Sequence, residues 1–184
     1  MTNFLLVVTG KTASGKDTVI SALLKRFPEF KKVITTTSRA PRAGETDGFD
    51  YNFISKEEFE KKINNGDFIE YVDYAGNLYG TEKSQLEQNQ PLIWRIDPSR
   101  AGKVRELIKD REVLVIYLTV DDETVLQRLT GRGLGTKEIE ARMNDDKTFW
   151  ETYKDKYDVV VENTLGQLNQ TIDKIIEIIE NQRS

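Results

Sequence analysis

The stretch from Gly10 to Thr18, with the sequence GKTASGKDT, most constrains what this chain can fold into. It follows an apolar run at residues 4–8 that is typical of a buried strand, and it precedes a helical pattern of apolar residues that extends to Phe27. Glycines let successive backbone N–H groups turn toward an anion, and a helix that begins near Gly15 directs its positive dipole end there. This order of elements predicts a loop that binds the phosphates of a nucleotide.

The loop matches the pattern G-x-x-x-x-G-K-[ST] at Gly10, Gly15 and Lys16, and departs from it at the last position, which holds Asp17. A carboxylate beside phosphates is repulsive unless Mg²⁺ or a lysine intervenes, but it can also ligate Mg²⁺ directly or through water. Asp17 and Thr18 are therefore candidate metal ligands. The residues expected to contact the nucleotide phosphates are Gly10, Thr12, Ala13, Ser14, Gly15, Lys16, Asp17 and Thr18.

The residue inventory agrees with phosphoryl transfer. The chain has 184 residues, enough for one domain, and a net charge of −4 from 27 basic and 31 acidic residues, so no nucleic-acid partner is expected. It contains no Cys and no His, which excludes thiolate nucleophiles and histidine bases. Phosphoryl transfer needs neither, because it relies on positioning, cationic side chains and Mg²⁺. No targeting signal or membrane-spanning run is visible, so we expect a cytoplasmic protein without a membrane partner; an oligomeric state is not indicated.

Alternating strand and helix patterns predict an α/β fold with a parallel sheet that is covered by helices on both faces. The expected strands are 4–9, 32–37, 92–97, 113–120 and 157–161, and the expected helices are 15–27, 98–109, 121–129, 136–156 as one helix or two, and a last helix capped by Asn163. Ligands bind such sheets at the carboxyl ends of the strands, where the loop at Gly10, Arg95 with Asp97, and Asp121 all lie.

Residues 35–82 differ in character and predict a small, mostly β subdomain. Strand patterns at 49–54, 68–74 and 78–81 surround a short helix that Ser55 begins as its N-cap. Polar side chains are scattered among these strands and the strand 92–97, and the alternatives of internal hydrogen bonding and ligand binding both remain open for them. They are Thr35, Tyr51, Glu70, Tyr79, Thr81 and Asp97.

Four arginines are candidate phosphate ligands, because a guanidinium offers planar, multidentate donors. A reaction between two phosphorylated molecules gathers roughly four negative charges, more than Lys16 alone neutralises. Arg39 and Arg42 lie in a turn-rich loop, Arg132 lies in a glycine-rich joint, and Arg142 lies in a charged helix; for any one of them a solvated surface charge is the alternative. Asp145 and Asp146, in the same helix, are interpreted as a solvated face.

Several motifs together resemble the guanylate kinase family, in family order and over nearly the whole chain. The most specific lie in the small subdomain. They are TTTSRAPRAGE at 35–45, DGFDYNF at 47–53, GDFIEY at 66–71 and GNLYGT at 76–81, followed by GRG at 131–133 and YDVVVEN at 157–163.

The resemblance implies a fold of the P-loop nucleoside monophosphate kinase type and the reaction of ATP with GMP to give ADP and GDP, with Mg²⁺. It implies one guanylate-kinase-like domain, with a core at 1–34, 90–124 and 157–184, a GMP-binding subdomain at 35–89 and a helical lid at 125–156. Arg39, Arg42 and Tyr51 would hold the GMP phosphate with Tyr79 beside it; Thr35, Glu70 and Thr81 would read guanine; Asp97 would also contact GMP; Arg132 and Arg142 would close over the transferred group; and Asn163 would lie near adenine.

The chain departs from the family pattern at specific positions. Asp17 replaces a residue that is usually Ser or sometimes Gly, and Arg95 replaces the first carboxylate of an Asp-x-Asp pair. Residues 98–100 replace a stretch that usually contains Gly, and Ala141 stands where a basic residue is common. These departures keep two alternatives open: a non-catalytic nucleotide- or protein-binding module, and a kinase for a different nucleoside or deoxynucleoside monophosphate.

Overall fold

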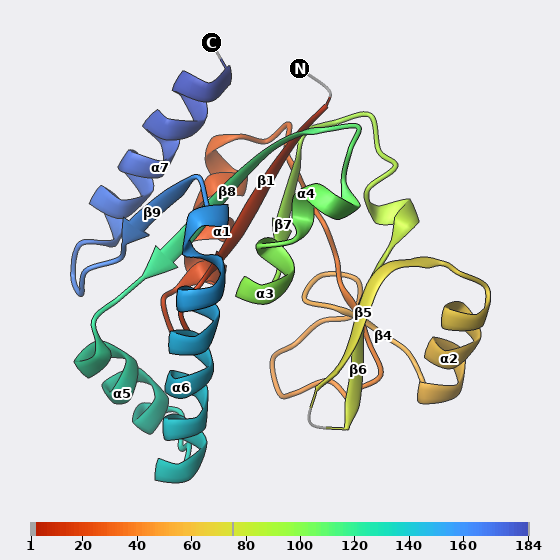
Figure 1. Cartoon of the computed structure of the whole chain (residues 1–184), viewed down its shortest axis with the longest axis horizontal. Helices are drawn as coiled ribbons and strands as arrows, with labels where there is room; N and C mark the ends of the chain where they lie inside the picture. The colour runs from red at the N-terminus through yellow and green to blue at the C-terminus, as the bar shows by residue number, and fades with distance from the viewer. Residues whose placement is uncertain (1–2, 75, 184) are drawn as a thin grey trace.

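The protein is described by a computed structural model that covers residues 3–74 and 76–183. Its core is a five-stranded sheet in the order β2-β7-β1-β8-β9, in which every strand pair is parallel. The strands are β2 (Lys31–Lys32), β7 (Leu92–Arg95), β1 (Phe4–Gly10), β8 (Glu112–Thr119) and β9 (Val159–Glu162). The predicted parallel sheet is confirmed (Figure 1).

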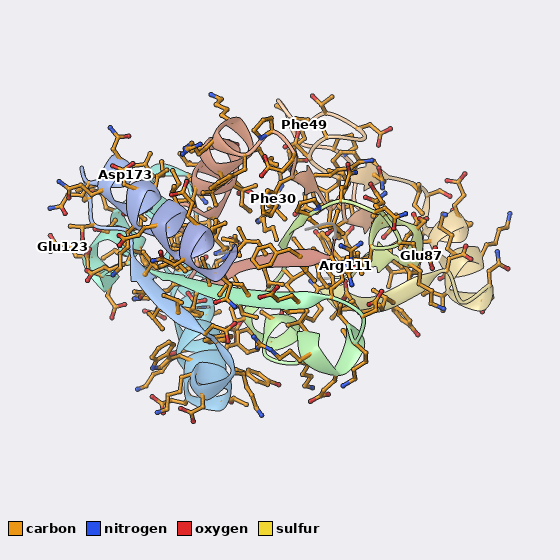
Figure 2. All side chains as sticks on the ribbon, turned by 90° about the horizontal axis from the view of Figure 1, so that it is seen from above. Phe30, Phe49, Glu87, Arg111, Glu123 and Asp173 are labelled. Carbon is orange, nitrogen blue, oxygen red and sulfur yellow. The ribbon has the colours of Figure 1, made fainter. Side chains whose placement is uncertain are left out.

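Helices cover both faces of this sheet, as Figure 2 shows from above. α1 (Lys16–Arg26) and α7 (Leu168–Arg183) pack on one face, where Leu6 and Val8 of β1 contact their apolar side chains. α3 (Pro98–Ala101) and α4 (Val104–Leu107) pack on the other face, with α6 (Thr136–Tyr153), against Leu5, Val7 and their neighbours. Because side chains alternate along a strand, the buried run of β1 supplies both cores.

A second, four-stranded sheet in the order β4-β3-β6-β5 lies to one side of the core (Figure 1). Its strands are β3 (Thr36–Thr37), β4 (Asn52–Phe53), β5 (Phe68–Tyr74) and β6 (Asn77–Glu82). α2 (Lys56–Asn64) packs on it through Phe59, which stacks on Phe68. The predicted cap is confirmed: the Ser55 side chain accepts from the Glu58 N–H while Glu58 accepts from the Ser55 N–H.

α5 (Asp122–Gly131) and the first part of α6 lie on the opposite side of the molecule from the second sheet (Figure 1). Asp121 caps α5, as expected, by accepting from the Thr124 N–H. The structure also contains the short 3-10 helices η1 (Lys83–Gln85) and η2 (Lys154–Lys156). Among the described residues, no helix combines the length and apolar character that crossing a bilayer requires.

Three expected elements differ from the structure. The run 32–37 does not form one strand, because β2 pairs with β7 in the core while β3 pairs in the second sheet. Only Asn52 and Phe53 of the run 49–54 form a regular strand. The run 98–109 breaks at Gly102 into α3 and α4; a Cβ added at Gly102 would lie 2.4 Å from Cδ1 of Tyr153 in α6. The first and third corrections come from contacts between segments far apart in the chain, whereas residues 46–51 form a local turn in which the Phe49 and Asp50 N–H groups donate to the Thr46 carbonyl oxygen.

Candidate functional site

The phosphate loop joins β1 to α1 at the carboxyl end of the sheet. Gly10 has φ 139°, and a Cβ there would lie 2.0 Å from the carbonyl oxygen of Leu118 in the neighbouring strand β8. Gly15 precedes α1 with φ 89°, a left-handed conformation that L side chains avoid. Ala13 is also left-handed, with φ 55°, so the loop holds a strained backbone between the two glycines.

Lys16 begins α1 and its ammonium group turns back over the loop. Its Nζ donates to the carbonyl oxygens of Gly10 (2.8 Å) and Lys11 (2.7 Å). Burial lowers the pKa of Lys16 to about 8, and the positive charge of Arg95 acts in the same direction, while Asp146 opposes the shift. A bound phosphate would favour the charged form of this lysine.

Two polar side chains from distant segments support the loop. Asn163, which is buried, donates from Nδ2 to the Ser14 carbonyl oxygen (2.8 Å). It follows β9 and does not cap the last helix, because α7 begins only at Leu168. Asp146 of α6 is also buried and accepts from the Thr12 N–H (2.8 Å). The expectation of a solvated face is therefore wrong for Asp146, whose pKa burial raises against the opposing effects of that N–H and of Lys16.

A bridge of polar contacts runs from the loop to the second sheet. Arg95 Nε lies 3.2 Å from Oδ1 of Asp17, and Arg95 Nη1 donates to Tyr51 Oη at 3.4 Å. Burial lowers the pKa of Arg95, but Asp17 and Tyr51 more than offset this effect and the pKa is raised. Two of the positions at which the chain departs from the family pattern, Asp17 and Arg95, thus contact each other.

The residues expected to read a base lie in or beside the second sheet, with Glu70 on its edge strand β5, Thr81 on β6 and Thr35 just before β3. Glu70 and Thr81 face each other across β5 and β6, and both Glu70 Oε1 and Thr81 Oγ1 are buried without a hydrogen-bond partner among the described residues. Arg100 of α3 contacts Glu70 Oε2 at 2.5 Å and also pairs with Asp97. Buried polar atoms without partners suit a site that a ligand completes.

Asp97 has a structural role as the cap of α3. Its carboxylate accepts from the backbone N–H groups of Ser99 and Arg100. Burial opposes its ionisation, but the charge of Arg100 and the Ser99 hydroxyl outweigh burial and hold the pKa of Asp97 below its usual value. Asp97 is therefore an anionic anchor for Arg100 at the edge of the site.

The arginines expected to bind phosphate lie in different parts of the molecule. Arg39 pairs with Glu45 (2.9 Å) and lies over the ring of Tyr51, and its buried Nε has no partner among the described residues. Arg42 is exposed; its backbone N–H donates to Glu45. Arg132 is exposed after α5, whereas Arg142 pairs with Glu138 within α6.

One cleft of about 250 Å³ connects the phosphate loop with the second sheet. It brings together seven of the predicted site residues, namely Gly10, Thr12, Lys16, Thr35, Tyr51, Tyr79 and Asp97. The other predicted residues do not line it: Ala13, Ser14, Gly15, Asp17, Thr18, Arg39, Arg42, Glu70, Thr81, Arg132, Arg142 and Asn163. Asp17 contacts Arg95 and Glu70 contacts Arg100, and both of these arginines line the cleft.

Sequence reasoning placed Arg95 at the ligand-binding end of its strand, but it missed that Asp146 and Arg100 line this cleft. A signal for Asp146 was present, since it continues the apolar stripe of Ile139 and Met143 toward Trp150 at helical spacing. A carboxylate in such a stripe indicates a buried partner. Arg100 carried no such signal, because its partner Glu70 lies in another segment.

The residues present fit Mg²⁺ only together with a nucleotide. Among residues 3–74 and 76–183, no group of three or more acidic, His or Cys side chains is arranged to hold a metal ion. Mg²⁺ commonly takes one or two protein ligands and completes its shell with water and substrate phosphates. Asp17, whose side chain is 70% exposed, has one carboxylate oxygen on Arg95 and could offer the other.

Comparisons with known proteins agree with this geometry. A family model described as guanylate kinase matches residues 2–182. A guanylate kinase of Fusobacterium nucleatum is 37% identical over 182 residues, 96% of either chain, and one of Symbiobacterium thermophilum is 39% identical over 163 residues, 86% of this chain and 77% of its own. The crystal structure of guanylate kinase from Anaplasma phagocytophilum has a TM-score of 0.74 at 24% identity, with 99% of this chain and 87% of that chain covered, which supports the fold.

Proposed function

Since this chain is an enzyme of the guanylate kinase family, we propose that it transfers the γ-phosphoryl group of ATP to GMP and forms ADP and GDP. The observation that carries the proposal is the cleft in which Lys16 and the phosphate loop meet Thr35 and Tyr51, which adjoin strands of the second sheet, and Tyr79 of β6. A donor bound on the loop and an acceptor bound on the second sheet would share this space. Positioning of two nucleotides side by side is the main requirement of phosphoryl transfer.

The donor half binds ATP through the loop from Gly10 to Thr18. Its backbone N–H groups and the N-terminus of α1 surround the phosphates, and Lys16 exchanges its contacts with the loop carbonyls for phosphate oxygens. Asn163 holds the Ser14 carbonyl, so it acts on the shape of the loop as well as lying on the adenine side.

The acceptor half binds GMP on the second sheet. Arg39, Arg42 and Tyr51 hold its phosphate with Tyr79 beside them, and Thr35, Glu70 and Thr81 read guanine. The orphaned oxygens of Glu70 and Thr81 support this assignment, because guanine presents both N–H donors and an acceptor oxygen. Asp97 contributes through Arg100, which it anchors.

Mg²⁺ enters with ATP in this proposal. When bound, it neutralises phosphate charge and polarises the transferred group. Asp17 and Thr18, at the start of α1, are the residues that would hold it, directly or through water. Arg132 and Arg142 approach the transferred group from the lid side. We also propose a cytoplasmic location, with which the absence of cysteine agrees.

The test is a coupled assay of ADP formation with ATP, Mg²⁺ and GMP. We expect GMP-dependent ADP formation by the wild type and a loss of at least about 10²-fold in Lys16→Ala, since Lys16 alone supplies a charge to the transferred group from the loop. Lys25→Ala, an exposed lysine on the same helix, is the matched control and should behave as the wild type. No GMP-dependent ADP above the Lys16→Ala level would refute the proposal.

A different acceptor is the second candidate, and the contact of Arg100 with Glu70 favours testing it. A panel of GMP, dGMP, IMP, AMP and the pyrimidine monophosphates separates the two, with GMP expected to be preferred. Glu70→Gln should reduce the preference for GMP over AMP. An unchanged preference would show that Glu70 does not read the base, and tight GMP binding without turnover would favour a binding module.

A further inference from the structure

Arg95 lies between the two halves of the cleft. It ends β7, and its guanidinium contacts Asp17 on α1 at 3.2 Å and Tyr51 of the second sheet at 3.4 Å. It lines the same cleft as Lys16 and Tyr79. A single cationic group therefore touches the phosphate loop and the acceptor side at once.

The Arg95 guanidinium has N–H donors that the described residues do not use. Among the described residues, its polar contacts involve only Nε and Nη1, which leaves the Nη2 group for a ligand, and its side chain is 36% exposed. A planar guanidinium binds phosphate oxygens in a bidentate manner. Its place beside Lys16 is where the phosphates of two bound nucleotides would meet.

The contact with Tyr51 indicates which nucleotide Arg95 serves. Lys16 faces the loop carbonyls on the donor side, whereas Arg95 reaches away from the loop to a hydroxyl of the second sheet. Arg39 lies over the ring of the same tyrosine, 5.6 Å from its centroid. Arg39 and Arg95 thus both contact Tyr51, and Arg95 does so from within the cleft.

Asp17 holds the guanidinium in this direction. Its side chain is 70% exposed, and an ion pair that is so open to water contributes little to folding. Its effect is instead geometric, because its contact with Nε holds one edge of the guanidinium, while Nη1 donates to Tyr51, which lines the cleft. Asp17 therefore acts as a positioning residue through Arg95.

We propose that Arg95 binds the phosphate of the acceptor nucleotide and that Asp17 orients it. This inference rests on the proposed function and adds a substrate-binding residue to it. It also explains how a carboxylate is accommodated beside the phosphate loop, since its charge is balanced by the arginine that contacts it.

The experiment measures binding of GMP to the full chain by calorimetry, without ATP or Mg²⁺. Arg95→Ala should weaken GMP binding by about 10- to 100-fold, the range for a hydrogen bond to a charged group. ATP binding should change by less than about threefold, and Arg95→Lys should lie between Arg95→Ala and the wild type because it keeps the charge and loses the fork. Added guanidinium should restore part of the affinity of Arg95→Ala.

Two controls separate a phosphate contact from a structural effect. Guanosine, which lacks the phosphate, should bind the wild type and Arg95→Ala with the same affinity. Arg26→Ala removes the same charge from an exposed ion pair with Glu180 and should leave GMP binding unchanged. Unaltered GMP affinity in Arg95→Ala, or an equal loss for guanosine, would overturn the role of Arg95.

The role of Asp17 is tested by a double-mutant cycle. Asp17→Asn should weaken GMP binding less than Arg95→Ala, and it should have no further effect in the Arg95→Ala background. Additive losses would overturn the positioning role. If the wild type binds no GMP, the proposed acceptor is wrong, and the same cycle with the best acceptor of the panel decides on Arg95 separately.

Discussion

At the scale of single residues, burial and the charged groups around Lys16 determine its pKa. Burial and, to a smaller extent, the charge of Arg95 lower the pKa of Lys16 to about 8, and the carboxylates of Asp146 and Asp17 act in the opposite direction. Its ammonium group donates to two loop carbonyls in the absence of phosphate. The lysine is therefore close to its titration range under ordinary assay conditions.

We predict that ATP affinity falls as the pH rises above about 8, where free Lys16 loses its proton. Phosphate oxygens stabilise the protonated form, so ATP binding should take up protons in this range, with a loss approaching tenfold per pH unit. Calorimetry in buffers of different ionisation enthalpy measures the uptake. Asp146→Asn should move the fall to lower pH, because it removes a charge that raises the pKa; an identical profile in Asp146→Asn would contradict this account.

At the scale of secondary-structure elements, packing against α6 determines where α3 ends and α4 begins. Gly102 lies against the ring of Tyr153 on α6, and Asp97 caps the short helix that precedes it. The cap also anchors Arg100, which extends to Glu70 in the second sheet. The junction thus connects the position of α6 to the acceptor side of the cleft.

We predict that Gly102→Ala destabilises the protein by about 1–3 kcal/mol, the usual cost of overpacking, because the new Cβ would lie 2.4 Å from Tyr153 Cδ1. Gly131→Ala is the matched control, since a Cβ at Gly131 meets no atom within 4 Å. Urea unfolding of both variants measures the difference. Equal midpoints would mean that the close contact at Gly102 does not determine the break.

Two arms extend from the core at the scale of the whole molecule. The second sheet with α2 lies on one side, and α5 with the first part of α6 lies on the other (Figure 1). Arg132 and Arg142 belong to the arm that α5 and the first part of α6 form, and neither arginine lines the cleft. They reach the transferred group only if this arm moves toward the acceptor side.

We predict that nucleotides bring the arms together, because charges on both arms converge on the phosphates. The chain has no native cysteine, so Glu57→Cys in α2 and Lys137→Cys in α6 give a specific pair of labels at exposed positions. Their distance distribution should shorten with GMP, Mg²⁺ and a non-hydrolysable ATP analogue. A pair on the core, Lys109→Cys and Glu177→Cys, should not change, and an unchanged arm pair would argue against closure.

The sequence by itself determined the features that depend on neighbouring residues. The buried run 4–8, the spacing of Gly10, Gly15 and Lys16, and the capping box at Ser55 and Glu58 all follow from local backbone and side-chain chemistry. The parallel pairing of the core strands also followed, because strands that alternate with helices are joined by crossover connections. These patterns were sufficient to predict the fold class and the location of the phosphate loop.

Only the tertiary structure decided which distant residues share a contact. Asp17 meets Arg95, Thr12 meets Asp146, Ser14 meets Asn163, and Glu70 meets Arg100. The two residues of each pair are too far apart in the chain for helix or strand periodicity to relate them. A buried charge is tolerated only where a partner of this kind exists. The unusual Asp17 is one half of a pair with Arg95, which became visible when the fold brought α1 and β7 together.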